Sequence, residues 1–200
     1  MRSSWMLGPQ ASTAWPKPPW QTNFWAAPAV ELGEPHLAFV QGRVAGAFRS
    51  TPKGVILHGT RSGRADNTIR QEYTGTVAYV ARGTDTVTGW NLTCGEGEIT
   101  EHMGVAEWGW NARAASRYYL GCEFAQAVEA WDITDAQVDA FCWWFLNRVL
   151  PRWPGISYHF PTHAEVEDSG ETGQQDGKSD VFSTGSPRAD ELRARIMSRL

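Results

Sequence analysis

A histidine stands where a buried strand is expected to end. Residues 54–63 read GVILHGTRSG, and the apolar run 55–57 leads into His58 and then into a loop of small and polar residues. The loops that follow strands are where α/β sheets place binding and catalytic side chains. An imidazole at that point is a candidate metal ligand, provided that other segments supply further ligands.

The other histidines and the acidic residues are the candidates for those further ligands. A catalytic zinc ion takes three protein ligands of the histidine, aspartate or cysteine kind and keeps a fourth position open. The chain has four more histidines, namely His36, His102, His159 and His163. A lone histidine is more often a hydrogen-bonded structural residue than a ligand, so its place in the chain has to decide.

The three cysteines are expected in the core. Cys94, Cys122 and Cys142 are an odd number, include no CxxC pair and lie in apolar or strand-like runs. This pattern argues against a disulfide framework and fits folding in a reducing compartment. We expect buried thiols that pack as small hydrophobic side chains.

Composition indicates a soluble globular protein. The 200 residues are 42% hydrophobic and 20% charged, and the net charge of −4 comes without a basic stripe, so we expect no nucleic-acid partner. No stretch reaches the ~18 apolar residues of a membrane span. The N-terminus lacks the continuous apolar segment of a signal peptide, so we expect no export by that route.

The first 48 residues differ from the rest. They are rich in proline, tryptophan and small side chains, without a sustained helical or strand period. Four of the eleven tryptophans fall in the first 25 residues, which argues against disorder. We expect an N-terminal arm over residues 1–48 that packs its tryptophans on a domain formed by residues 49–200.

Strands and helices alternate in the rest of the chain. We expect buried strands at 54–58 and 119–125, a short strand at 156–159, and a hairpin over 86–103 that turns at 95–97. This pattern is typical of an α/β fold in which helices flank a central mixed sheet.

Helical spacing predicts three helices. The first covers 67–81, the second follows a capping box at 134–137 and stops before Pro151, and the third starts near Pro187. The stretch 165–178 is acidic and rich in glycine, so we expect an exposed loop there.

Seven segments of the chain follow one another in an order known from one family. They are GVILHGT, GWNLTCGEGEITEHM, GWNARAAS, YLGCEFA, ITDAQVDAF, THAEV and GKSD. Together they resemble the zinc-dependent N-acetylmuramoyl-L-alanine amidases, the type shared with phage lysozyme-amidases and peptidoglycan recognition proteins. The likeness covers residues 50–182, and its specificity comes from the order of the motifs rather than from any single one.

The resemblance implies a zinc ion on His58, His163 and Asp180. THAEV matches the family's late metal-histidine segment and contains His163. His159, at the end of the expected short strand, is the rival for the second histidine.

The third ligand is the least determined by the resemblance. The spacing to Asp180 is longer than the family usually shows, which we attribute to an insertion, EDSGETGQQDG, because loops tolerate added length at small entropic cost. Asp168 and Asp176 therefore stay open as alternatives. The Lys-x-Asp spacing of Lys178 and Asp180 favours Asp180.

The resemblance also assigns catalytic roles. Zinc held by two imidazoles and one carboxylate lowers the pKa of a bound water from ~15.7 towards ~7. Glu123 matches the strand carboxylate that takes the water proton, and Lys178 matches the ammonium that stabilises the oxyanion. From the sequence alone, Glu123 could equally be a surface or salt-bridged residue, and Lys178 a solvated loop lysine.

Two expected substrate-binding positions depart from the family pattern. Trp90, followed by Asn91, stands where many members have tyrosine and histidine, and tryptophan offers only an N–H donor. Asn111 replaces the histidine of the Trp-His-Ala segment. We expect Trp90 and Asn111 near the substrate, with catalysis depending on zinc, Glu123 and Lys178.

The function that the resemblance implies is cleavage of the amide between N-acetylmuramic acid and L-alanine in bacterial peptidoglycan. We expect a monomeric phage endolysin, made in the host cytoplasm and acting on the cell wall after release. The alternative is a peptidoglycan-binding module of the same fold without turnover. A more distant possibility is a structural or regulatory phage protein whose arm makes the contacts.

Overall fold

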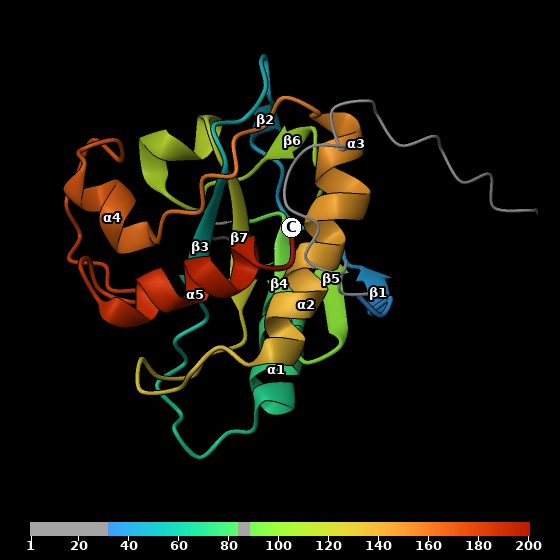
Figure 1. The fold of residues 1–200 in the computed structure, drawn as a ribbon, viewed down its shortest axis with the longest axis vertical. Coiled ribbons are helices and arrows are strands. Elements are labelled where there is room, and N and C mark those ends of the chain that lie inside the picture. The colour runs from blue at the N-terminus through green and yellow to red at the C-terminus, as the bar shows by residue number, and fades with distance from the viewer. Residues whose placement is uncertain (1–31, 84–88) are drawn as a thin grey trace, which may run out of the picture.

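The computed structural model describes residues 32–83 and 89–200, and its centre is a five-stranded sheet (Figure 1). The strands lie side by side in the order β1–β5–β4–β7–β3. β4 and β5 form the expected antiparallel hairpin, and the other three pairs are parallel, so the sheet is mixed as predicted. The bounds are β1 His36–Phe39, β3 Val55–Gly59, β4 Leu92–Cys94, β5 Glu98–Glu101 and β7 Leu120–Phe124. A separate antiparallel pair joins β2, Gly46–Ala47, to β6, Glu107–Trp108.

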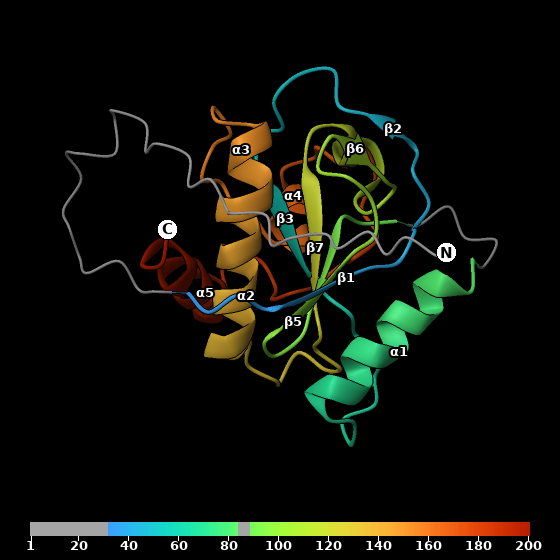
Figure 2. The same cartoon turned by 90° about the vertical axis from the view of Figure 1, so that its right-hand side faces the viewer.

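Helices cover both faces of this sheet (Figure 2). On one face, α2 (Asp135–Trp144) runs on through a π-helical segment, Phe145–Val149, into α3 (Leu150–Arg152), and α5 (Pro187–Met197) packs against α2. On the other face lies α1 (Ile69–Ala81). Two short elements complete the fold: a 3-10 helix at Arg113–Arg117, and α4 (His163–Asp168), which contacts β3. Within the described residues no helix is both long and apolar enough to cross a membrane.

Three helices begin with the same local device. In α1, α2 and α4 a threonine side chain accepts a hydrogen bond from the backbone of the residue three positions on, whose side chain bonds back to the threonine N–H. This capping box satisfies two backbone donors that the first helical turn leaves free. The box at Thr134 and Gln137 was the start signal predicted for α2.

Strand alternation divides the buried side chains between the two faces. The main core, under α2, takes alternate residues of β3, β4 and β7: Val55, Leu57, Leu92, Cys94, Leu120, Cys122 and Phe124. All three cysteines are buried free thiols, as expected. The residues between them on β3 and β7 face the other way, because successive strand side chains alternate. His58 and Glu123 therefore share the face that carries α1 and α4.

The structure differs from the expected arm over residues 36–47. β1 pairs in parallel with β5, and β2 pairs with β6, so this stretch is joined to the sheets. Such pairing is made with residues far along the chain and leaves no local period. Residues 1–31, with the four tryptophans, lie outside the described residues, so the division of the chain at residue 48 stays a prediction.

Pro151 does not end its helix. The N–H of Leu150 donates to the carbonyl of Phe145, and this wider π-type turn precedes the proline and lets the helix continue to Arg152. The expectation that the helix stops before Pro151 is therefore wrong.

Residues 156–159 form no strand, although the chain runs alongside β3. The N–H groups of Val55 and Leu57 donate to the carbonyls of His159 and Pro161, at 3.1 and 2.9 Å. Because Pro161 has no N–H, it cannot return a hydrogen bond, and the ladder ends in an isolated bridge at Thr162.

The predicted exposed loop at 165–178 begins as a helix instead. α4 occupies His163–Asp168, where Ala164 and Val166 are buried, and only the residues after it are irregular. The acidic composition hid the short apolar face that fixes this helix to β3.

A buried chain of hydrogen bonds ties three strands together. His102 Nδ1 lies 2.9 Å from the carbonyl oxygen of Val40, which can only accept, so Nδ1 carries the proton. Nε2 then accepts from the Thr93 hydroxyl at 2.8 Å, and Thr93 Oγ1 accepts from the Trp90 indole N–H at 2.9 Å. Burial lowers the pKa of His102 to about 4, although the Val40 contact opposes this, so the ring is neutral.

This neutral histidine makes stability depend on pH. Its pKa rises from about 4 to 6.5 on unfolding, so its contribution is complete above pH 6.5 and is lost as the pH falls towards 4. The loss amounts to about 3 kcal/mol in the free energy of unfolding. In His102→Gln that part of the pH dependence should disappear, as measured by urea unfolding of metal-free protein at several pH values. Parallel pH profiles of the two proteins would contradict it.

Candidate metal centre

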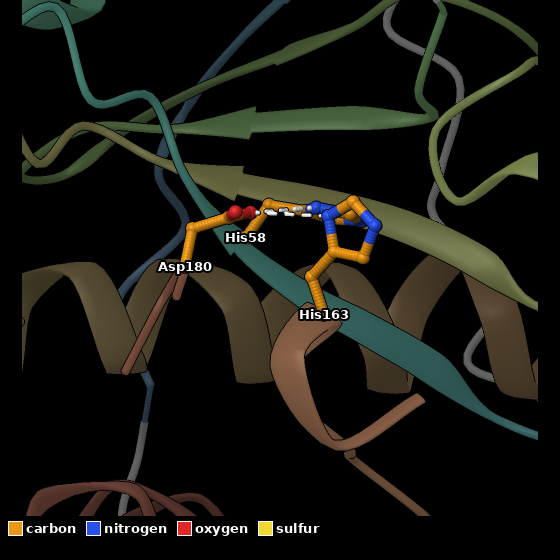
Figure 3. A group of neighbouring side chains, drawn as sticks. All are labelled: His58, His163 and Asp180. Atoms are coloured by element: carbon orange, nitrogen blue, oxygen red, sulfur yellow. Dashed lines mark hydrogen bonds and ion pairs between the residues drawn. The ribbon is translucent and has the colours of Figure 1, made fainter. Parts of the chain in front are cut away.

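Three separate elements bring His58, His163 and Asp180 together (Figure 3). His58 is the fourth residue of β3, His163 opens α4, and Asp180 lies in the irregular segment between α4 and α5. The Asp180 Oδ2 atom is 3.0 Å from His58 Nδ1 and 3.4 Å from His163 Nδ1. One ligand atom from each residue lies within 4.8 Å of the others, and no second such group occurs in the described part of the chain.

The rival ligands lie elsewhere. His159 is exposed, with its ring 6.1 Å from that of Tyr119. Asp168 is exposed at the end of α4, and Asp176 forms an ion pair with Arg113. The structure thus gathers the three residues that the sequence favoured and leaves out the alternatives.

The ionisation states of the cluster suit a metal cation. Burial lowers the pKa of His58, which is 2% exposed, so its imidazole is neutral. Burial alone would raise the pKa of Asp180, but the hydrogen bonds from His163 and His58 together outweigh it and hold that pKa well below its usual range. Zinc binds neutral imidazole and ionised carboxylate, so this donor set fits it.

Glu123 stands beside the cluster with an unsatisfied carboxylate. It is directly opposite His58 in the β3–β7 pairing and opposite Thr93 in the β4–β7 pairing. Its Oε2 atom is buried and has no hydrogen-bond partner. Burial raises the pKa of Glu123 well above its usual range, the charge of Asp180 raises it further, and Lys178 partly opposes them. A carboxylate in this setting is suited to take up a proton.

Lys178 contributes a positive charge from the segment that carries Asp180. Its side chain is exposed, and its charge lowers the pKa of both Glu123 and His58. The backbone is fixed by Glu167 of α4, whose two carboxylate oxygens accept from the N–H groups of Gly177 and Lys178, each at 2.8 Å.

Trp90 and Asn111 are placed differently from each other. Trp90 is 6% exposed and lines the cavity described below, but its N–H is donated to Thr93 and is not free for a substrate. Asn111 packs against Gly121, where a Cβ atom would come within 2.6 Å of Asn111 Nδ2. Its Oδ1 atom is buried without a partner, and the residue does not line the cavity. Of the two expected substrate contacts, the structure brings only Trp90 to the open site.

Asn91, the other departure from the family pattern, has a structural role. It is fully buried, its amide donates to the carbonyl of Glu107 at 2.9 Å, and its Oδ1 accepts from the N–H of Gly121 at 3.0 Å. It therefore joins β7 to β6 and does not line the cavity described below.

An open cavity of about 730 Å³ lies next to Glu123. Glu123 and Trp90 line its inner part, the loop after β3 contributes Thr60 and Ser62, and α1 contributes polar side chains such as Gln71. Sequence reasoning missed α1 as a wall, because helical spacing reports which face is apolar and not what the polar face borders. The half-burial of Ile69, Val77 and Val80 agrees with a helix at the rim of an open site.

The fold of the chain has known counterparts, although the sequence matches no protein-family model and no curated protein. The catalytic domain of XlyA is 20% identical, with a TM-score of 0.53 over 80% of this chain and 99% of that one. The N-acetylmuramoyl-L-alanine amidase LysC from Clostridium intestinale URNW is 13% identical, with a TM-score of 0.53 over 82% and 98%. This is the amidase fold.

The amidase fold is also found in recognition proteins. The ectodomain complex of peptidoglycan recognition proteins LCa and LCx, solved with bound tracheal cytotoxin, is 13% identical, with a TM-score of 0.50 over 74% of this chain and 90% of that chain. The amidase fold that the motif order implied is confirmed by these structures. At such identities the likeness defines the architecture, and the activity has to be argued from the site.

The cluster predicts zinc binding that depends on three residues. Protein loaded with zinc and then desalted should retain about one ion per chain, because a site with three converging ligands holds zinc tightly. His58→Ala, His163→Ala and Asp180→Ala should each lose most of it, whereas the control His159→Ala should not, by elemental analysis. Full zinc content in the Asp180 variant would move the third ligand to another acid of the loop.

The unpaired carboxylate predicts a gain of stability on its removal. Because folding raises the pKa of Glu123, its ionisation opposes folding increasingly as the pH rises above the unfolded value of about 4.5. Metal-free Glu123→Gln should exceed the wild type by about 1–3 kcal/mol in unfolding free energy at neutral pH, and by less at pH 4. Chemical unfolding measures this, with the exposed Glu191→Gln as control. A less stable Glu123→Gln would show that the carboxylate is satisfied.

Proposed function

We propose that the protein is a peptidoglycan hydrolase that cleaves the amide bond between N-acetylmuramic acid and L-alanine with a zinc-activated water. The observation that carries this proposal is the convergence of two imidazoles and a carboxylate beside Glu123, a carboxylate with a buried, unpartnered oxygen. The amidase fold, which LysC shares, supports the choice of bond.

His58, His163 and Asp180 would hold the metal. Zinc bound there would supply a Lewis acid that lowers the pKa of a water molecule. Glu123 would take a proton from the water that attacks the amide carbonyl carbon, and would then deliver this proton to the nitrogen of the departing L-alanine. The ammonium of Lys178 stabilises the negative charge on the carbonyl oxygen. Trp90 takes no part in proton transfer, since its only N–H is engaged by Thr93.

The cavity supports an extended polar substrate. Its volume of about 730 Å³ and its lining by hydroxyl, amide and charged side chains suit a glycopeptide more than a compact apolar ligand. Glu123 lies where the cavity meets the sheet, so a chain bound along α1 would present its amide to this carboxylate.

A role as a phage endolysin accompanies this proposal. It rests on the motif order shared with phage lysozyme-amidases, and it would place synthesis in the host cytoplasm and action at the wall, by a monomer.

A peptidoglycan-binding module without turnover is the second candidate. It is favoured by Trp90, which stands where many amidases have a tyrosine and whose indole N–H is donated to Thr93, so that one donor is missing from the substrate side. The three candidate ligands and the unpaired Glu123 favour the enzyme, because binding alone requires none of them.

Assays on purified cell wall separate the two candidates. We expect release of new amino groups, abolished by a chelator and restored by zinc. Glu123→Gln should lose at least about 10²-fold in rate, the usual effect of removing a general base, while keeping zinc and wall binding. Chelator-resistant release would remove zinc from the mechanism. Wall binding without release by the wild type would favour the binding module.

A further inference from the structure

Arg61 joins the loop after β3 to the backbone on both sides of Asp180. Its Nη2 atom donates to the carbonyl oxygens of Ser179 and Val181, at 2.9 and 2.7 Å. Its Nε atom donates to the side-chain oxygen of Gln126 at 3.1 Å. One guanidinium nitrogen therefore holds the carbonyl groups of the residues before and after the candidate third ligand.

Arg61 is itself held in an unusual backbone conformation. Its φ angle of 51° lies in the left-handed region, which is uncommon for a residue with a side chain. Its N–H donates to the carbonyl of Gln126 at 2.8 Å, so the residue is fixed at its backbone as well as at its guanidinium.

The residues on either side of Arg61 are fixed by Glu72 of α1. The carboxylate of Glu72 is 3% exposed and accepts from Thr60 Oγ1 and Ser62 Oγ, both at 2.6 Å, and from the Ser62 N–H at 3.2 Å. A further bond comes from Asn67 Nδ2 at 3.0 Å. These donors to the Glu72 carboxylate thus come from the loop that contains Arg61, and Glu72 itself borders the cavity.

Asp180 has few other supports. It lies between α4 and α5 outside any helix or strand, and its carbonyl receives only a long contact of 3.4 Å from the N–H of Ala164. A metal ligand has to be placed within a few tenths of an ångström, and the groups that orient ligands contribute strongly to affinity. The two bonds from Arg61 are shorter than this contact from Ala164, and they act together with the burial of Val181 to fix the backbone next to Asp180.

We propose that Arg61 is a positioning residue for Asp180 and is itself held in place by Glu72. One connected set of hydrogen bonds then links α1, which lines the cavity, to the third metal ligand. The inference rests on the proposed metal site. As a positioning residue, Arg61 acts through the backbone of residues 179–181 and not through a contact with substrate or metal.

A second arginine offers a matched control. Arg188 of α5 donates to the carbonyl oxygens of Glu129 and Ala130 and pairs with Asp132, so it also spans neighbouring peptide groups with one guanidinium. Its polar contacts go to residues 129–132 and not to residues 179–181, and its guanidinium lies over the ring of Phe182, 4.3 Å from the centroid. Loss of its hydrogen bonds to Glu129 and Ala130 should lower the stability of the protein without changing the position of Asp180.

The test is a titration of metal-free protein with Co²⁺, followed by its visible absorption at a temperature well below unfolding. Arg61→Lys keeps the charge but loses the separate Nε–H donor that orients the guanidinium on Gln126, and its shorter reach and single nitrogen no longer fix the carbonyls of Ser179 and Val181 in one plane. We expect a 10- to 100-fold weaker affinity and an altered spectrum, about the usual effect of removing a group that orients a ligand. Arg188→Lys should bind Co²⁺ as the wild type does. Glu72→Gln should weaken binding in the same direction by a smaller factor.

The outcomes separate the two proposals. Wild-type affinity and spectrum in a folded Arg61→Lys would overturn the positioning role. Should Arg61→Lys fail to fold, Glu72→Gln decides, and unchanged affinity there overturns it as well. No Co²⁺ binding by the wild type would instead refute the metal site itself.

Discussion

The parallel pairing of β3 with β7 is the constraint on which the site depends. In this register His58 lies directly opposite Glu123, and alternation turns both side chains away from the core under α2. The same alternation sends Leu57 and Cys122 into that core, where the hydrophobic effect fixes the register: a slip by one residue would bury a carboxylate and an imidazole among aromatic rings. Core packing on one face thus determines the chemistry on the other.

The site contains buried polar groups that lower the stability of the protein, and interactions elsewhere in the fold offset this loss. Glu123 keeps a buried oxygen without a partner, and His58 Nε2 is likewise buried and unbonded. Such groups reduce stability, and they persist in proteins mainly where function requires them. The compensation comes from the continuous core under α2 and from fully satisfied networks such as Glu72 with its loop.

Much of the architecture was predictable, because local patterns reported it. The apolar run before His58 predicted β3, alternation around a glycine turn predicted the β4–β5 hairpin, and the Thr134 capping box predicted the start of α2. β1 was not predicted, and the strand predicted at 156–159 is an irregular stretch beside β3, because hydrogen bonds to partners distant in sequence decide both. α4 was missed because four of its six residues are polar or charged side chains outside any long period.

The candidate ligands came from an ordered set of motifs, and the structure shows that they meet. The supports of those ligands could not be predicted in this way. Arg61 and Glu72 act on backbone groups of distant segments, and a contact with a carbonyl oxygen leaves no signature in the identity of the residue contacted. Likewise the engagement of the Trp90 indole depends on Thr93 and His102, which only folding brings beneath it.

Glu167 connects the two ends of the irregular segment that separates His163 from Asp180. It lies one helical turn after His163, and its carboxylate accepts hydrogen bonds from the backbone N–H groups of Gly177 and Lys178. The eight residues from 169 to 176 therefore form a loop, and both ends of this loop are attached to α4. Because both ends are fixed to α4, a change in the length of this segment should be absorbed within it at small entropic cost, with loss of its ion pairs to Lys53 and Arg113 and little displacement of Asp180.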